Sequence, residues 1–132
     1  MAIDYGLKRT GIAVTDPLQI IANGLTTVET PRLLPFLKDY CTRESVELII
    51  VGDPRNLDDS PTHATPHVQR FLRQLKNAFP SIPVLTVDER YTSKMASRAM
   101  IEMGMKKKQR RDKSLVDEIA ATIMLQEYLQ NR

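Results

Sequence analysis

The sequence predicts an α/β domain built on a mixed five-stranded sheet with helices on both faces. Two short β-branched and apolar segments near the N-terminus are joined by a turn that contains Gly6, which predicts a hairpin. Two later apolar runs have almost no polar interruption, which is typical of strands buried on both faces of a parallel sheet. Apolar residues also recur at helical spacing around those runs. The predicted order, β-β-β-α-β-α-β-α-α, combines a hairpin with βα units.

The first three strands are predicted to form a meander. Residues 2–4 begin it, and the segment 10–15 (TGIAVT) is the expected hairpin partner. Asp16 and Pro17 end the second strand, because proline cannot donate to a strand ladder. Residues 19–28 are the third strand, with an irregular middle.

The periodicity becomes helical after Pro31. Proline is tolerated in a first helical turn, and Leu33, Leu34 and Leu37 follow at helical spacing. The apolar run 46–52 predicts the next buried strand. Residues 53–66 are rich in Asp, Pro, Ser and Asn, which predicts a loop. The remaining predicted elements are a helix over 68–75, a strand over 83–88, a helix over 95–103 and a final helix over 114–129.

Composition indicates a single globular domain over residues 1–132. Apolar residues make up 42% of the chain and charged residues 27%, as in soluble proteins. No apolar run is long enough for a membrane span, and the first residues do not resemble a signal peptide. A single cysteine excludes an internal disulfide. We therefore expect a cytoplasmic protein.

Charge is distributed unevenly along the chain. Residues 1–66 carry 6 basic and 9 acidic side chains, whereas residues 67–132 carry 13 basic and 7 acidic ones. The segment 106–113 alone has six basic residues. This asymmetry favours a polyanionic partner, although a solvated basic loop would give the same pattern. The low aromatic content argues against a base-stacking platform for single strands.

Three acidic residues are candidates for a functional site because of their positions. Asp4 lies in or at the end of the first predicted strand, Glu89 follows the strand 83–88, and Asp117 lies in the first turn of the last helix. Carboxyl ends of strands are where ligands bind in such sheets. Asp88 alternates with Glu89 across its strand, so only one of the two should face a site, and we favour Glu89.

Each acid also has a structural interpretation. Asp4 could be an edge-strand acid, and Glu89 could pair with a neighbouring base. Asp117 completes a capping-box pattern with Ser114, and its side of the helix is expected to pack on the sheet. Glu118 lies about 100° further round the helix and is expected in solvent.

Together the three acids predict a metal site. Converging carboxylates repel one another unless a cation neutralises them. Ligation by oxygen alone selects Mg²⁺ or Mn²⁺. Two such ions about 4 Å apart can hold both the attacking and the leaving oxygen of a phosphoryl displacement. The acids would hold metal and the basic residues would hold a polyanion.

Four segments resemble a known family in the same order. The segment 4–16 (DYGLKRTGIAVTD) resembles the opening motif of the YqgF family, whose members are described as pre-16S rRNA nucleases or Holliday junction resolvase-like proteins. The second, third and central-loop motifs of that family resemble the segments 87–93 (VDERYTS), 113–121 (KSLVDEIAA) and 52–58 (GDPRNLD). The resemblance covers essentially the whole chain.

The resemblance implies an RNase H-like fold and a metal-dependent nuclease acting on structured nucleic acid, with precursor 16S ribosomal RNA favoured over branched DNA. It implies that Asp4, Glu89 and Asp117 are catalytic residues that bind Mg²⁺ or Mn²⁺. It also implies substrate contacts by a basic set: Lys8, Arg9, Arg90, Lys106, Lys107, Lys108, Arg110 and Arg111.

Other functions remain open at this point. A Holliday-junction-type DNA resolvase and a non-catalytic RNA-binding assembly factor both fit the same fold. A nucleotide-dependent phosphotransferase is disfavoured, because such enzymes close two domains of this kind around ATP. The ribosome is a candidate partner, and we expect a monomer or a weak homodimer.

Overall fold

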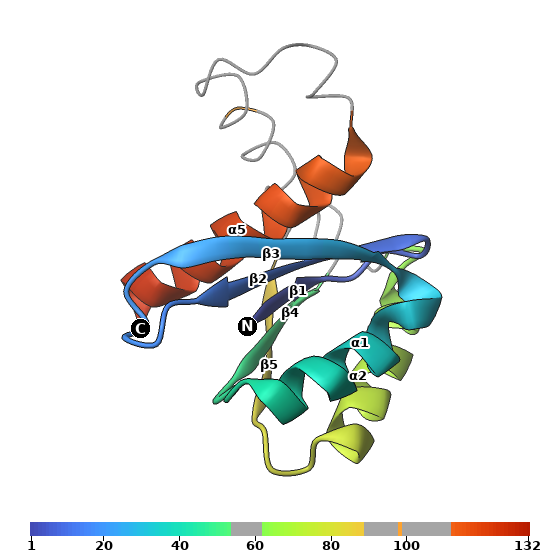
Figure 1. Cartoon of the computed structure of the whole chain (residues 1–132). Helices are drawn as coiled ribbons and strands as arrows, with labels where there is room; N and C mark the ends of the chain where they lie inside the picture. Colours follow the sequence, from blue (N-terminus) through green and yellow to red (C-terminus); the bar gives the residue numbers. More distant parts are fainter. Residues whose placement is uncertain (54–61, 89–97, 99–111) are drawn as a thin grey trace.

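A five-stranded mixed sheet forms the centre of the molecule (Figure 1). The structure is a computed structural model that describes residues 1–53, 62–88, 98 and 112–132. The strand order is β3-β2-β1-β4-β5, which confirms the predicted mixed sheet of the α/β class. The strands are β1 (Ala2–Asp4), β2 (Arg9–Thr15), β3 (Ala22–Glu29), β4 (Ile49–Asp53) and β5 (Val84–Asp88).

The short strand β1 is the middle strand of the sheet. It pairs antiparallel with β2 on one side and parallel with β4 on the other, and β5 continues the parallel part. Ala2 and Ile3 are fully buried, as a central strand requires. The irregularity expected in the meander is a register shift in the β2–β3 ladder, between Ile12 and Ala13.

Helices cover both faces of the sheet (Figure 1). The helix α5 (Lys113–Asn131) packs on one face, where Ala121, Met124 and Leu125 meet Ala2 and Ala13. The helices α1 (Leu33–Arg43) and α2 (Thr65–Ala78) cover the other face, and a short 3₁₀ turn, η1 (Thr30–Arg32), leads into α1. The second apolar core lies there and contains Ile3, Ile12, Leu33, Leu37, Val51, Phe71 and Leu75.

The elements follow the predicted order wherever the structure describes them. The helix α2 starts at Thr65, whereas the sequence predicted loop as far as residue 66. Pro66 does not prevent the earlier start, because the first turn of a helix needs no amide donor at that position. The predicted helix over 95–103 lies outside the described residues except for Arg98, which is helical.

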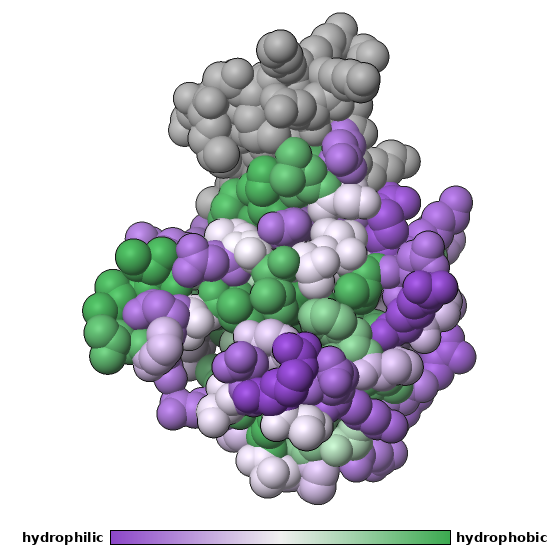
Figure 2. All heavy atoms as spheres, viewed as in Figure 1, coloured by the Kyte–Doolittle hydropathy of each residue, from purple (hydrophilic) through white to green (hydrophobic). Residues whose placement is uncertain are grey.

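The loop between β2 and β3 exposes apolar side chains at the end of the sheet where β1 begins. Figure 2 shows this apolar surface at the left of the view, and Leu18, Ile20 and Ile21 are 76%, 61% and 57% exposed. The Asp16 carboxylate holds the loop by accepting hydrogen bonds from the backbone amides of these three residues. These bonds, that from the Ile21 amide above all, lower the pKa of Asp16.

None of the helices in the part of the chain that the structure describes is both long and apolar enough to span a membrane.

Candidate active site

Acidic residues gather where the parallel strands end. Asp4 is the last residue of β1, and Asp53 and Asp88 are paired at the ends of β4 and β5. Side chains alternate along a strand, so Asp4 lies on the same face as Ala2, which packs under α5. Val87 also packs on that side, which puts Asp88 on the opposite face. The structure thus places Asp88 away from the face of Asp4, as expected.

A close contact between β2 and α5 brings the backbone of Asp117 against Gly11, the residue that pairs with Asp4. Asp4 pairs with Gly11 across the β1–β2 ladder. A Cβ atom at Gly11 would lie 2.8 Å from Glu118 N and closer still to the carbonyl group of Asp117. The backbone of α5 therefore rests directly on Gly11, and a side chain there would push the helix away. Asp117 lies in the second turn of α5, whereas the sequence predicted the first, because the helix begins at Lys113. This second turn is held against the strand that flanks Asp4.

Arg9 connects the turn after β1 to the same helix. Its Nε atom lies 3.5 Å from Oδ2 of Asp117, and the two side chains are 34% and 28% exposed. A cavity of about 520 Å³ opens beside this pair, lined by Lys8, Arg9, Thr27 and Ser114 among others. Arg9 of the opening motif therefore contacts one of the three predicted metal ligands, and Lys8 lines the cavity next to it.

The turn that carries Lys8 and Arg9 is fixed by Thr30. Thr30 Oγ1 donates to the carbonyl of Gly6 at 2.6 Å, and the Thr30 amide donates to the carbonyl of Lys8 at 3.0 Å. Because the Thr30 hydroxyl hydrogen is used in this way, the buried Thr10 hydroxyl donates to Thr30 Oγ1 at 3.0 Å. Sequence analysis missed Thr30, because it is remote from every motif and nothing local indicates its partners.

The start of α5 has two anchors. The Asp112 carboxylate accepts from the amides of Ser114 and Leu115, which makes Asp112 the N-cap. The capping box built on Ser114 is therefore wrong, since Ser114 lies inside the helix. Thr27 Oγ1 on β3 donates to the Ser114 carbonyl at 2.6 Å. Asp117 is therefore not the second member of a capping box with Ser114.

Glu118 differs from the prediction. Its side chain is half-buried and lies over Gly24 of β3 instead of in solvent. Gly24 has no side chain, and this leaves room for the Glu118 methylene groups between helix and sheet.

Four of the predicted site residues lie on neighbouring elements of the structure: Asp4 at the end of β1, Lys8 and Arg9 where the turn leads into β2, and Asp117 on α5. The others lie outside the described residues. Within the described residues no group of three His, Cys, Asp or Glu side chains could hold a metal ion. The site residues that fall outside are Glu89, Arg90, Lys106, Lys107, Lys108, Arg110 and Arg111.

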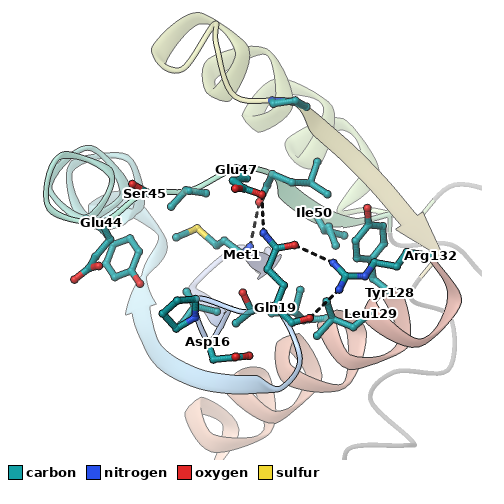
Figure 3. Close-up of a pocket in the computed structure, with 18 of the residues that line it drawn as sticks. Met1, Asp16, Gln19, Glu44, Ser45, Glu47, Ile50, Tyr128, Leu129 and Arg132 are labelled. Atoms are coloured by element: carbon teal, nitrogen blue, oxygen red, sulfur yellow. Dashed lines mark hydrogen bonds between the residues drawn. The ribbon is translucent and has the colours of Figure 1, made fainter.

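A second cavity, of about 640 Å³, lies at the opposite end of the sheet (Figure 3). Its walls include Met1, which directly precedes β1, and the last turns of α5. Gln19 crosses it, donating to Glu47 at 2.6 Å and accepting from Arg132 at 2.9 Å (Figure 3). Because this cavity lies at the amino end of β1, it is separate from the predicted acidic site.

Comparison with known proteins identifies the family of this chain. A family model described as "RuvX: Holliday junction resolvase" matches residues 1–131. A protein of Christiangramia forsetii named "Putative pre-16S rRNA nuclease" is 57% identical over 129 residues, which cover 98% of this chain and 96% of that protein. Proteins of the same name from Porphyromonas gingivalis and Bacteroides thetaiotaomicron are each 54% identical, over 99% and 100% of this chain and 95% and 96% of their own lengths. The chain therefore belongs to the RuvX family, also called YqgF, and has its RNase H-like fold.

Proposed function

We propose that this protein is a metal-dependent endonuclease that trims the ends of precursor 16S ribosomal RNA. The names of its relatives support the substrate and the nuclease activity. One contact in the structure supports the site: the backbone of α5 rests on Gly11, the ladder partner of Asp4. The contact supports a site in which these two carboxylates, from distant parts of the chain, act together beside Lys8 and Arg9.

The donor set fits a hard cation. Asp4 and Asp117 offer carboxylate oxygens, the ligands that Mg²⁺ and Mn²⁺ prefer. With Glu89 as the third ligand, these residues would hold the metal. A bound metal of this kind supplies an activated water and stabilises the leaving oxygen of a phosphodiester.

The basic residues have a separate role. Lys8 is exposed and Arg9 is partly exposed on a turn that Thr30 fixes, so both can meet a phosphate with little reordering. Arg9 forms an ion pair with Asp117, and it would exchange part of that pairing for a phosphate oxygen when RNA binds. Arg90 and the basic residues among 106–111 would extend these backbone contacts.

Cleavage of branched DNA is a second candidate. The description of the matching family model favours it, because it names a Holliday junction resolvase. Contacts to phosphate groups and a metal held by carboxylates would serve the cleavage of RNA and of DNA equally. The cytoplasm is the proposed location, the ribosome the proposed partner, and a monomer or weak homodimer the proposed state.

A cleavage assay separates these functions. Labelled precursor 16S RNA, an unstructured RNA and a four-way DNA junction are each incubated with the protein in Mg²⁺, in Mn²⁺ and in chelator. We expect cutting of the precursor that requires metal and is lost in Asp4→Asn, while binding in chelator is retained. Preferred cutting of the junction would support the resolvase. Binding without cutting by the parent protein would support a non-catalytic assembly factor.

A further inference from the structure

A small cavity lies at the same edge of the sheet as Asp4, but on the face covered by α1 and α2. Its volume is about 260 Å³. This is slightly below the range of roughly 300–1,000 Å³ that suits drug-sized ligands. Its walls include Tyr5 and Leu7 from the turn, Thr30, and Arg70, Phe71 and Gln74 from α2.

The cavity offers one aromatic ring. Tyr5 stacks on Phe71, with ring centroids 4.8 Å apart and an interplanar angle of 24°. Phe71 is only 2% exposed, whereas Tyr5 is half-buried. Phe71 therefore supports the Tyr5 ring from within the core, and Tyr5 is the ring that a ligand can reach. Leu7, which is 53% exposed, adds an apolar surface on the turn.

Two polar side chains of α2 also line the cavity, whose remaining walls are Pro31, Leu33 and Leu34. Arg70 and Gln74 are four residues apart on α2 and so lie on the same side of the helix. An Arg guanidinium donates in a plane, and a Gln amide both donates and accepts. A flat ring with mixed donors and acceptors along its edge matches this set. A nucleobase has that chemistry.

The small cavity and the cavity beside Arg9 have no lining residue in common, but residues of one turn line both. Tyr5 follows Asp4 directly, and Lys8 and Arg9 from the same turn line the cavity beside Asp117. Thr30, which also lines the small cavity, fixes this turn through Gly6 and Lys8. A strand whose phosphates contact Lys8 and Arg9 would bring a flanking base to Tyr5.

We propose that this cavity binds one unstacked base of the RNA strand next to the cleaved phosphate, with Tyr5 as the stacking surface. The proposal rests on the nuclease function proposed above. Proteins commonly recognise single-stranded RNA by holding splayed bases on aromatic or Arg planes. The low aromatic content of the chain excludes an extended platform but leaves room for one such base.

The test uses a short single-stranded RNA in which 2-aminopurine replaces each base in turn. Binding is measured in chelator, so that the result does not depend on cleavage. We expect one position to lose fluorescence on binding. An abasic residue at that position should weaken binding by about 5- to 150-fold, the range expected for loss of one stacked base.

Matched variants link that position to the cavity. Tyr5→Leu should abolish both the fluorescence change and the abasic penalty, and Tyr5→Phe should keep both. Gln74→Ala changes an exposed residue and should alter which base is preferred there without affecting folding. Tyr40→Leu is the control, because Tyr40 lines the cavity at the opposite end of the sheet.

The outcomes separate this proposal from the nuclease function. A fluorescence change that depends on Tyr5, in a protein that cuts no RNA with metal, would support the base site and contradict the nuclease. Metal-dependent cutting with no responsive base would overturn the base site alone. The same abasic penalty in the parent protein and in Tyr5→Leu would also overturn it. If Tyr5→Leu fails to fold by circular dichroism, an unchanged base preference in Gln74→Ala overturns the proposal instead.

Discussion

Replacing Gly11 by Ala should damage the active site through the position of α5. The new Cβ would lie 2.8 Å from Glu118 N, whereas an ordinary contact begins at 3.4 Å. To relieve the contact with Glu118 N, α5 would have to move away from β2 by about 0.6 Å. The Asp117 carbonyl lies nearer still and raises this displacement of the helix to about 1 Å. Both contacts are backbone atoms of a helix that packs along β2 and β3, so neither can rotate away.

The shift has two measurable consequences. Overpacking of this kind lowers the free energy of unfolding by about 1–3 kcal/mol. Displacing a catalytic group by about 1 Å can cost about 100-fold in rate. Because Asp117 moves with the helix, we expect Gly11→Ala to cut RNA about 100-fold more slowly. Urea unfolding gives the first quantity, and single-turnover cleavage below the unfolding temperature gives the second.

Gly24→Ala is the matched control. Its Cβ would lie 2.9 Å from Cγ and 3.0 Å from Cδ of Glu118, which are side-chain atoms that can move. We expect a stability change within about 0.5 kcal/mol and nearly normal cleavage. If Gly11→Ala were as active as the parent protein, that result would show that the contact between α5 and β2 does not position Asp117.

Two further predictions concern the loops. Thr30→Val removes the hydroxyl that donates to Gly6 and leaves the buried Thr10 hydroxyl without its partner. Urea unfolding should therefore show a free energy of unfolding that is lower by about 1–3 kcal/mol, and Thr30→Ser should recover most of this loss. Equal losses in both variants would contradict the role of the hydroxyl. Asp16 has a lowered pKa when folded, so its contribution to stability is fully present above the ordinary value of 3.8 and is lost as pH falls through the lower folded value. The difference in unfolding free energy between the parent protein and Asp16→Asn should therefore be constant above about pH 5 and shrink below about pH 4; a difference that does not change over this range would contradict it.

The order of the elements could be predicted because local sequence patterns identify most of them. The prediction that the strand over 83–88 is buried on both faces is wrong, because β5 is an edge strand and Leu85 is 45% exposed. The strand β4 was expected from residue 46 but begins at Ile49, since the chain only enters the sheet there and Glu47 remains exposed. The amphipathic pattern of Leu33 and Leu37 placed α1 correctly, and both are buried in the core.

The site could be predicted only in part, because its decisive contacts join distant residues. The sequence shows a glycine at 11 but not that the Asp117 backbone rests on it. Asp112 and Ser114 are both good caps, and local chemistry does not distinguish them. Thr30 holds Gly6 across 24 positions of sequence, a contact that no local pattern predicts.

We propose that Asp4 and Asp117 act as one site. The most direct measurement is single-turnover cleavage of precursor 16S RNA in Mg²⁺ by Asp4→Asn, Asp117→Asn and the double variant. Residues that act as a unit are strongly non-additive, so the double variant should be about as slow as either single variant. Losses that multiply in the double variant, or a single variant that cuts at the parent rate, would contradict the claim.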